Sequence, residues 1–256
     1  MLKSLEAGLA SAGLRLARAR KHLEEFEELE AAYVATDPIK FHISPLADGG
    51  GILSFATLKD PPTDLGAAAD DAIGNMRESL DHTLFAFAEV SGITTEAGMK
   101  ALQFPTGETP ELFEKVLPGR TKGIDSRVVD TVRAAKPFLD PNDPENPGSW
   151  LQYLHELSNP KKHRIISSTP VFSGYAEMHI SQIYMGPKLQ QWVPAGHQAI
   201  CAFPDTGIKA ALVPGICFPG NEGLFGKRAA DQMNRIHEVC TETVASFKAL
   251  AEREFP

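Results

Sequence analysis

The apolar residues near the start of the chain recur every three or four positions. The series consists of Leu2, Leu5, Leu9, Ala12, Leu16, Ala19, Leu23 and Phe26. Because an α-helix completes one turn in about 3.6 residues, this spacing places most of the series on one helical face. The pattern predicts a long helix that packs this face against the rest of the protein.

Two further segments carry the same helical period. The central one spans residues 65–90, with its apolar stripe at Ala69, Ile73, Met76, Leu80, Leu84 and Phe87. The last one has its stripe at Met233, Ile236, Cys240, Val244, Phe247 and Leu250, and is long enough to lie antiparallel to the first helix. Shorter helices are predicted over residues 126–138 and 149–159. The second should end before Pro160, because proline disfavours helical geometry in the residue that precedes it.

Between the helices the pattern changes to the alternation typical of strands. Residues 36–62 contain two such runs around an Asp and three glycines, which predicts a β-hairpin. Residues 139–149 are rich in proline and asparagine and are predicted to be a loop. Residues 165–218 form a strand-rich segment, which indicates an antiparallel sheet. We therefore predict a single α+β domain over residues 1–256, in which the long first and last helices and the central helix pack with antiparallel strands.

Composition excludes few classes of function. The 256 residues are 43% hydrophobic, which is enough to fill the core of one large domain. Asp and Glu outnumber Lys and Arg by 33 to 25, and the net charge of -8 argues against a surface that binds polyanions in general. Charges interrupt the apolar pattern of the first helix, so we expect neither a secretory signal nor a membrane span, and a cytoplasmic location. The scattered Cys201, Cys217 and Cys240 indicate buried thiols rather than disulfides.

The segment NMRESLDH, residues 75–82, places four polar side chains within two turns of the otherwise apolar central helix. At about 100° per residue, Arg77 and Asp81 lie on one flank of the apolar stripe, and Asn75 and His82 lie on the other. In a structural interpretation these side chains form a buried hydrogen-bonded network between helices. In a catalytic interpretation His82 is a general acid or base, and Arg77 holds a phosphate in a bidentate fork.

A second polar cluster spans residues 155–164. His155 belongs to the predicted helix 149–159, and the basic run that follows lies beyond its C-terminal end, where the helix dipole favours cations. If the two clusters meet in space, histidines and arginines converge, which suits metal-free cleavage of a phosphodiester. The catalytic residues would then be Arg77, His82 and His163, and the substrate-binding residues would be Asn75, Asp81, His155, Lys162 and Arg164.

The remaining motifs do not indicate a cofactor. Neither an H-E-x-x-H sequence nor paired cysteines anchor a metal, so no metal site is expected. Residues 219–228 follow a strand-like run as a phosphate-binding loop would. They have one residue too many between Gly220 and Gly226, and Arg228 replaces the required Ser or Thr. We expect no nucleotide site there.

Four motifs follow one another along the chain. They are N-x-R-x-x-L-D-H at residues 75–82, F-P at residues 104–105, K-P-F at residues 136–138, and L-x-x-L-x-N-x-x-K-H-R at residues 154–164. This order resembles a family of uncharacterised bacterial and phage proteins over most of the chain. The resemblance implies no established activity.

The spacing of Arg77 and His82 is also similar to the arginine–histidine signature of HEPN-type ribonucleases. This resemblance implies RNA cleavage by these two residues, usually across a dimer of helical bundles. It also supplies an alternative fold, a mainly helical HEPN-like bundle with β insertions.

Two functional hypotheses follow from the sequence. The first is a metal-independent protein that cleaves RNA or binds another phosphate-bearing ligand through Arg77 and His82. The second is a non-catalytic, homo-oligomeric interaction protein, for instance a homodimer through its long helices, in which the polar cluster is a buried structural network. Neither hypothesis involves a membrane.

Overall fold

The computed structural model describes residues 3–45, 51–57, 59–143, 145–159, 169–173, 198–201, 213–217 and 228–255. The chain divides into two compact units. The first comprises Met1–Glu24, Ala69–Arg164 and Met233–Pro256, and the second comprises Glu25–Ala68 and Ile165–Gln232. The sites discussed below lie in the first unit. The basic run at residues 161–164 and the glycine-containing run 219–227 lie outside the described residues.

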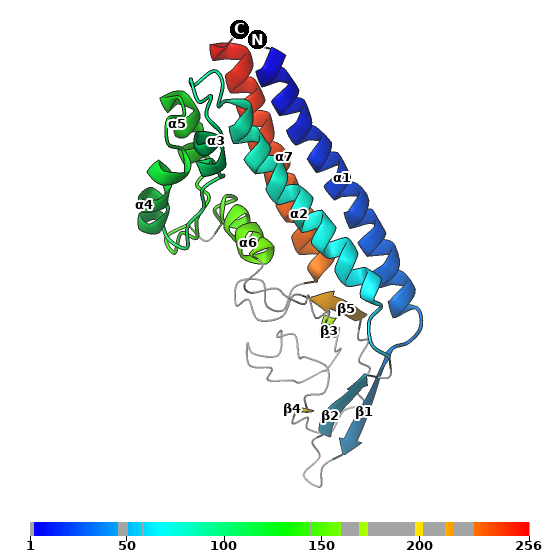
Figure 1. Cartoon of the computed structure of the whole chain (residues 1–256). Coiled ribbons are helices and arrows are strands. Elements are labelled where there is room, and N and C mark those ends of the chain that lie inside the picture. The colour runs from blue at the N-terminus through cyan, green and yellow to red at the C-terminus, as the bar shows by residue number, and fades with distance from the viewer. Residues whose placement is uncertain are drawn as a thin grey trace. The chain divides into compact units, whose positions relative to one another are not determined.

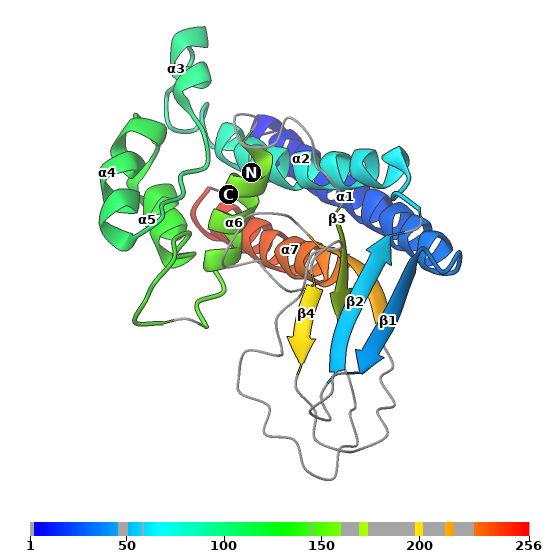
Figure 2. The same ribbon diagram turned by 90° about the horizontal axis from the view of Figure 1, so that it is seen from below.

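The first unit contains most of three long helices. They are α1 (Lys3–Val34), α2 (Thr63–Ala86) and α7 (Ala229–Glu254), and Figures 1 and 2 show them side by side. His237 Nε2 of α7 lies 3.1 Å from the carbonyl oxygen of Leu16 on α1, and Arg20 donates to Asn234 Oδ1 at 2.7 Å. Because residue numbers rise along α1 as they fall along α7, the two helices are antiparallel. The predicted antiparallel arrangement of the first and last helices is confirmed.

The three predicted apolar stripes are buried. Every stripe residue from Leu5 to Phe26 on α1, from Ala69 to Phe87 on α2, and from Met233 to Leu250 on α7 is at most 7% exposed. The helical period therefore identified the residues that hold this bundle together, because each helix must remove its apolar face from water. Among the described residues, no helix is both long and apolar enough to cross a membrane.

Four shorter helices follow α2. They are α3 (Glu96–Ala101), α4 (Pro110–Arg120), α5 (Ser126–Ala134) and α6 (Ser149–Ser158). α5 and α6 agree with the predicted helices, and α6 ends before Pro160 as expected. α3 and α4 were not predicted. The side chains of Thr95 and Thr109 cap their first turns by accepting hydrogen bonds from backbone N–H groups, an arrangement typical of helix starts.

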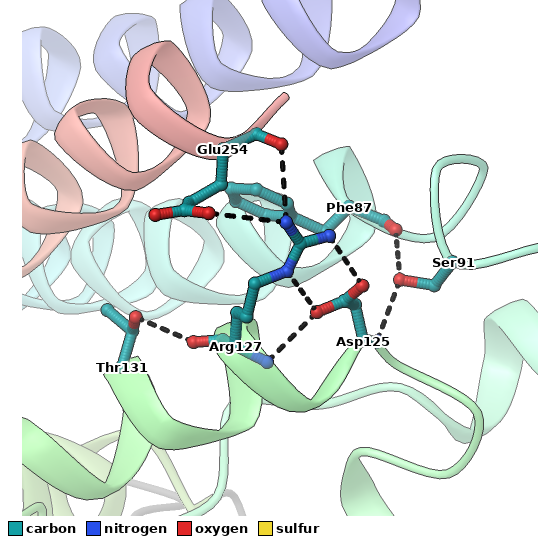
Figure 3. A network of polar contacts seen from close by, with 6 residues as sticks. All are labelled: Phe87, Ser91, Asp125, Arg127, Thr131 and Glu254. Carbon is teal, nitrogen blue, oxygen red and sulfur yellow. Dashed lines mark hydrogen bonds and ion pairs between the residues drawn. The ribbon is translucent and has the colours of Figure 1, made fainter. Parts of the chain in front are cut away.

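The N-terminal end of α5 is bound to the end of α7 by a network of polar contacts (Figure 3). Arg127 donates to both carboxylate oxygens of Asp125 at 2.9 Å, and its third guanidinium nitrogen lies 3.3 Å from the carbonyl oxygen of Glu254. The Arg127 guanidinium also stacks 4.3 Å from the centre of the Phe255 ring. On the other side, the Asp125 N–H donates to Ser91 Oγ at 3.0 Å. The network thus connects α5 with the segments that end α2 and α7.

The predicted loop between α5 and α6 is held by one buried asparagine. Asn146, 3% exposed, donates to the carbonyl oxygens of Lys136 and Phe138 at 3.0 and 2.9 Å. Its side-chain oxygen accepts from the N–H of Gly148 at 3.0 Å. A Cβ atom at Gly148 would collide with the carbonyl oxygens of Ala135 and Lys136, so the backbone can approach this closely only at a glycine.

The second unit contains short antiparallel strands. β1 (Ile39–Pro45) pairs with β2 (Gly51–Thr57), with Ile39 opposite Thr57, and β2 pairs with β4 (Gln198–Cys201). β3 (Thr169–Ser173) pairs with β5 (Val213–Cys217). Glu30 of α1, 1% exposed, accepts from the Ile216 N–H at 2.8 Å and from Arg228 at 2.7 Å. The buried carboxylate is thereby satisfied by a backbone donor and a cation.

The prediction of an α+β domain with packed antiparallel strands is wrong, because the described part of the chain is mainly helical. The described helices and the segments that join them contain an extensive buried apolar core, and Ile216 of β5 is also buried. The physical reason is the length of the helical stripes. α1, α2 and α7 bury each other's faces along many turns, whereas the strands are short ladders of four to seven residues.

Candidate functional site

The NMRESLDH cluster lies in the middle of α2, and the helix directs its polar side chains toward two different neighbours. Arg77 and Asp81 contact the segment that follows α3. Asn75 and His82 contact α1. Arg77 and His82 are five residues apart, so on a regular helix they point roughly 140° away from each other.

On the inner face, Arg77 and Asp81 together bind the backbone of Phe104. Arg77 Nη2 donates to the Phe104 carbonyl oxygen at 2.7 Å and to Asp81 Oδ1 at 3.0 Å. The same Asp81 oxygen accepts from the Phe104 N–H at 2.8 Å. The backbone N–H and C=O of Phe104 are therefore both hydrogen-bonded to this charged pair. The Phe104 side chain is 1% exposed and lies in the core.

Burial shapes the electrostatics around Arg77. Arg77 is only 7% exposed. Its burial away from water lowers the pKa of the guanidinium, and the carboxylate of Asp81 opposes this shift. Among the described residues, Arg77 Nη1 has no hydrogen-bond partner. The guanidinium remains charged, because arginine keeps its proton in proteins.

α6 contributes His155 to the surroundings of Arg77. Burial, and next the positive charge of Arg77, lower the pKa of the His155 imidazole. The neutral form of His155 is therefore favoured beside the buried cation. Burial raises the pKa of the Cys240 thiol on α7 to about 12, although the positive charge of Arg77 acts to lower it. Such a thiol is an inert core group rather than a nucleophile.

On the outer face, α2 and α1 are joined by a polar seam. Ser11 Oγ lies 2.9 Å from His82 Nδ1. One turn further along α1, Arg15 forms an ion pair with Glu78 at 2.8 Å and lies 3.5 Å from Asn75 Oδ1. These side chains are half-buried or exposed, and their partners come from a helix that contributes nothing to the Arg77 network.

His82 also lines a groove of about 760 Å³. It is lined by the first part of α1, by the last part of α2 and the turn that follows it, and by residues 93–100, which include α3. α1 and α2 approach closely at Gly8, where an added Cβ would lie 2.6 Å from the Ala86 Cβ atom. The lining residues are Ser4, Gly8, Ser11, His82, Phe85, Ala86, Glu89, Ile93, Thr94, Glu96, Met99 and Lys100.

The predicted site residues are therefore separated into groups. Arg77 and Asp81 are hydrogen-bonded, and His155 of the second polar cluster is close enough for their charges to shift its pKa. Whether the two clusters meet was left open by the sequence. Asn75 and His82 lie on the other side of α2. Lys162, His163 and Arg164 lie outside the described residues, so whether they complete either group stays a prediction. Within the part of the chain that is described, no group of three His, Cys, Asp or Glu side chains could hold a metal ion.

Sequence reasoning did not identify Ser11, Arg15 or the Phe104 backbone as partners. A backbone partner leaves no side-chain signal. For the α1 seam a signal exists: Ser11 and Arg15 on one helix, and Glu78 and His82 on the other, are both four residues apart. Polar residues four apart lie on the same helical face, so two such pairs can face each other across an antiparallel contact.

Comparisons with known proteins do not add to this description. No family model, curated protein or solved structure matches the chain. The motif resemblances to an uncharacterised bacterial and phage family and to HEPN-type ribonucleases therefore stay predictions.

Proposed function

We propose that the chain is a non-catalytic interaction protein, in which the Arg77–Asp81 half of the polar cluster is structural. One observation carries this proposal: the Arg77 guanidinium is 7% exposed and spends Nη2 on the Phe104 carbonyl and on Asp81. An arginine that clamps a phosphate must offer its parallel donors to the ligand. Arg77 instead uses Nη2 for the Phe104 carbonyl and for Asp81, and its Nη1 is buried.

The position of His82 supports the same conclusion. General acid–base catalysis on a phosphate bound by Arg77 would need the imidazole within hydrogen-bonding reach of the reacting atoms. His82 bonds to Ser11 on the face of α2 that turns away from Arg77. His155 senses the charge of Arg77, but burial lowers its pKa and favours the neutral form, which cannot serve as a general acid.

The experiment is an RNA-cleavage assay with matched variants. Purified protein is incubated with a mixed RNA pool, with and without chelator, beside Arg77→Met and His82→Gln variants whose folding is measured in parallel by urea unfolding. We expect no cleavage by any of the three proteins, a large loss of stability for Arg77→Met and a small one for His82→Gln. Chelator-resistant cleavage by the wild type that disappears in a stably folded His82→Gln variant would overturn the proposal.

Self-association is part of this proposal. The sequence suggests a second copy of the chain as one partner, through the long helices. Light scattering at several protein concentrations measures the mass in solution. A mass of twice 27.7 kDa would support a homodimer, and a constant mass of 27.7 kDa would restrict the proposal to other partners.

A further inference from the structure

The groove beside His82 combines an apolar surface with one unbalanced charge. Its volume of about 760 Å³ falls in the range of roughly 300 to 1,000 Å³ that is typical of small-molecule sites. It is formed by helices and by the segment that directly follows α2, all within the first unit.

The apolar part consists of Phe85, Ile93 and Met99. All three line the groove and remain partly exposed to solvent. A ligand with an apolar body would remove this surface from water, which is the main source of affinity in sites of this size. The close approach of Gly8 to Ala86 brings the two helices together beside this surface.

The charged part of the groove has a negative excess. Glu96 is paired with Lys100 at 2.6 Å, so these two charges balance each other. Glu89 is exposed, and its carboxylate has no hydrogen-bond or ion-pair partner among the described residues. It lies in the turn that follows α2 and lines the groove together with His82. The groove therefore offers one free anionic group beside an apolar surface.

The structure assigns to this groove a small amphiphilic amine as ligand, that is, a molecule with a compact apolar body and one protonated amino group. The apolar body covers Phe85, Ile93 and Met99, and the ammonium group pairs with the Glu89 carboxylate. The Ser11–His82 hydrogen bond fixes the orientation of the imidazole, which also lines the groove. This inference rests on the proposed function, because it names a ligand for a protein that binds rather than cleaves.

The probe is 2-(1-naphthyl)ethylamine, compared with the corresponding alcohol, 2-(1-naphthyl)ethanol, which has the same ring and no charge. Binding is measured by calorimetry and by two-dimensional NMR of the full chain near neutral pH. We expect saturable binding of the amine, with affinity for the alcohol lower by roughly fivefold or more, which is the size expected of one partly exposed ion pair.

Three variants locate the site. Glu89→Gln should reduce affinity for the amine about fivefold and leave affinity for the alcohol unchanged, because only the charge is removed. Glu252→Gln, an exposed residue of α7 outside the groove, is the matched control and should change neither affinity. Phe85→Ala should weaken both ligands; if it proves unstable, Met99→Ala replaces it.

The inference fails if the amine does not bind saturably, if amine and alcohol bind equally well, or if Glu89→Gln binds the amine like the wild type. None of these results would bear on the proposed function, which depends on the RNA-cleavage assay. Conversely, RNA cleavage that requires His82 would overturn the proposed function even if the amine bound.

Discussion

Arg77 Nη2 lies 2.7 Å from the carbonyl oxygen of Phe104, a residue 27 positions further along the chain. The contact joins the middle of α2 to the segment between α3 and α4, where regular secondary structure supplies no partner for that carbonyl group. A buried carbonyl without a partner is costly, so the arginine stabilises an irregular segment that the core needs for its Phe104 ring.

Replacing Arg77 with methionine should therefore destabilise the protein severely. The change leaves the Phe104 carbonyl without its donor and Asp81 without its cation, and we expect a loss of roughly 3 kcal/mol in the free energy of unfolding. Arg15→Met is the matched control, because its ion pair with Glu78 is 33% and 50% exposed; there we expect less than about 1 kcal/mol. Urea unfolding measures both changes in stability. Equal losses would show that the contacts of Arg77 with Asp81 and Phe104 stabilise the protein no more than the exposed ion pair does.

The stability of the fold should decrease in mild acid through His155. Burial and the Arg77 charge lower its pKa in the folded state below the ordinary value of 6.5, so the unfolded chain binds the proton first as the pH falls. The free energy of unfolding should therefore decline from about pH 6.5 downward, until the folded state also protonates. The charged neighbours that enter this balance are Arg77, Glu156, Arg120 and Asp81.

The measurement is a series of unfolding curves between roughly pH 5 and pH 8 for the wild type and for His155→Gln. We expect the variant to lose less stability than the wild type on acidification. His22→Gln controls for the removal of a histidine elsewhere. A pH dependence that is identical in the wild type and His155→Gln would contradict the assignment.

The loop between α5 and α6 should depend on two adjacent features. Asn146→Ala removes the two side-chain hydrogen bonds to the carbonyl oxygens of Lys136 and Phe138. Because these oxygens keep the Phe138 N–H and Ser149 Oγ as donors, the loss should be roughly 1 to 2 kcal/mol. Gly148→Ala should reduce the free energy of unfolding more. The added Cβ would collide with backbone atoms of Ala135 and Lys136, which cannot move aside as a flexible side chain could. The exposed Asn142→Ala, in the same loop, should lie within about 0.5 kcal/mol of the wild type. Thermal unfolding of the three variants ranks them, and the opposite order would refute this account of the loop.

The Arg127 network should contribute modestly and in a way that depends on salt and acid. The hydrogen bond that the Arg127 side chain donates to Asp125 lowers the pKa of the Asp125 carboxyl group in the folded state. A carboxyl group with a lowered folded-state pKa adds stability above its unfolded pKa, and this stability is lost as the pH falls through the folded value.

Arg127→Met should remove that acid-sensitive contribution and reduce stability only slightly at low salt, because the side chain is 44% exposed. The difference between wild type and variant should shrink in about 1 M salt. Unfolding curves at two ionic strengths and two pH values test this, and a difference independent of both would assign the effect to the Phe255 stacking alone.

The sequence predicted the bundle better than it predicted the fold class. The stripes of α1, α2 and α7 are long, and a period of 3.6 residues repeated over many turns has few other interpretations. α4 was missed although Thr109 and Pro110 are typical of a helix start, because Pro118 and Gly119 in its last turn suggested an irregular segment. The strand-like runs beyond residue 165 misled the fold class, since local alternation says nothing of how much core a strand supplies.

For the polar cluster, the helical period correctly separated Arg77 and Asp81 from Asn75 and His82. It could not identify the partner of Arg77, because every residue has a backbone carbonyl and the residue type does not show which one accepts the hydrogen bond. Nor could it show that Ser11 would lie opposite His82, since the relative position of two helices is set by packing contacts such as that of Gly8 with Ala86.

The pairing of α1 with α7 sets the order in which this protein can be completed during synthesis. The hydrogen bonds from Arg20 to Asn234 and from His237 to Leu16 join residues 214 and 221 positions apart. On the ribosome, α1 emerges before α2 and long before α7, so the part of its apolar stripe that packs on α7 has no partner until α7 has also emerged. The bundle should therefore close late and slowly, and a circular permutant that places α7 directly before α1 should fold faster, because the chain between them is then short.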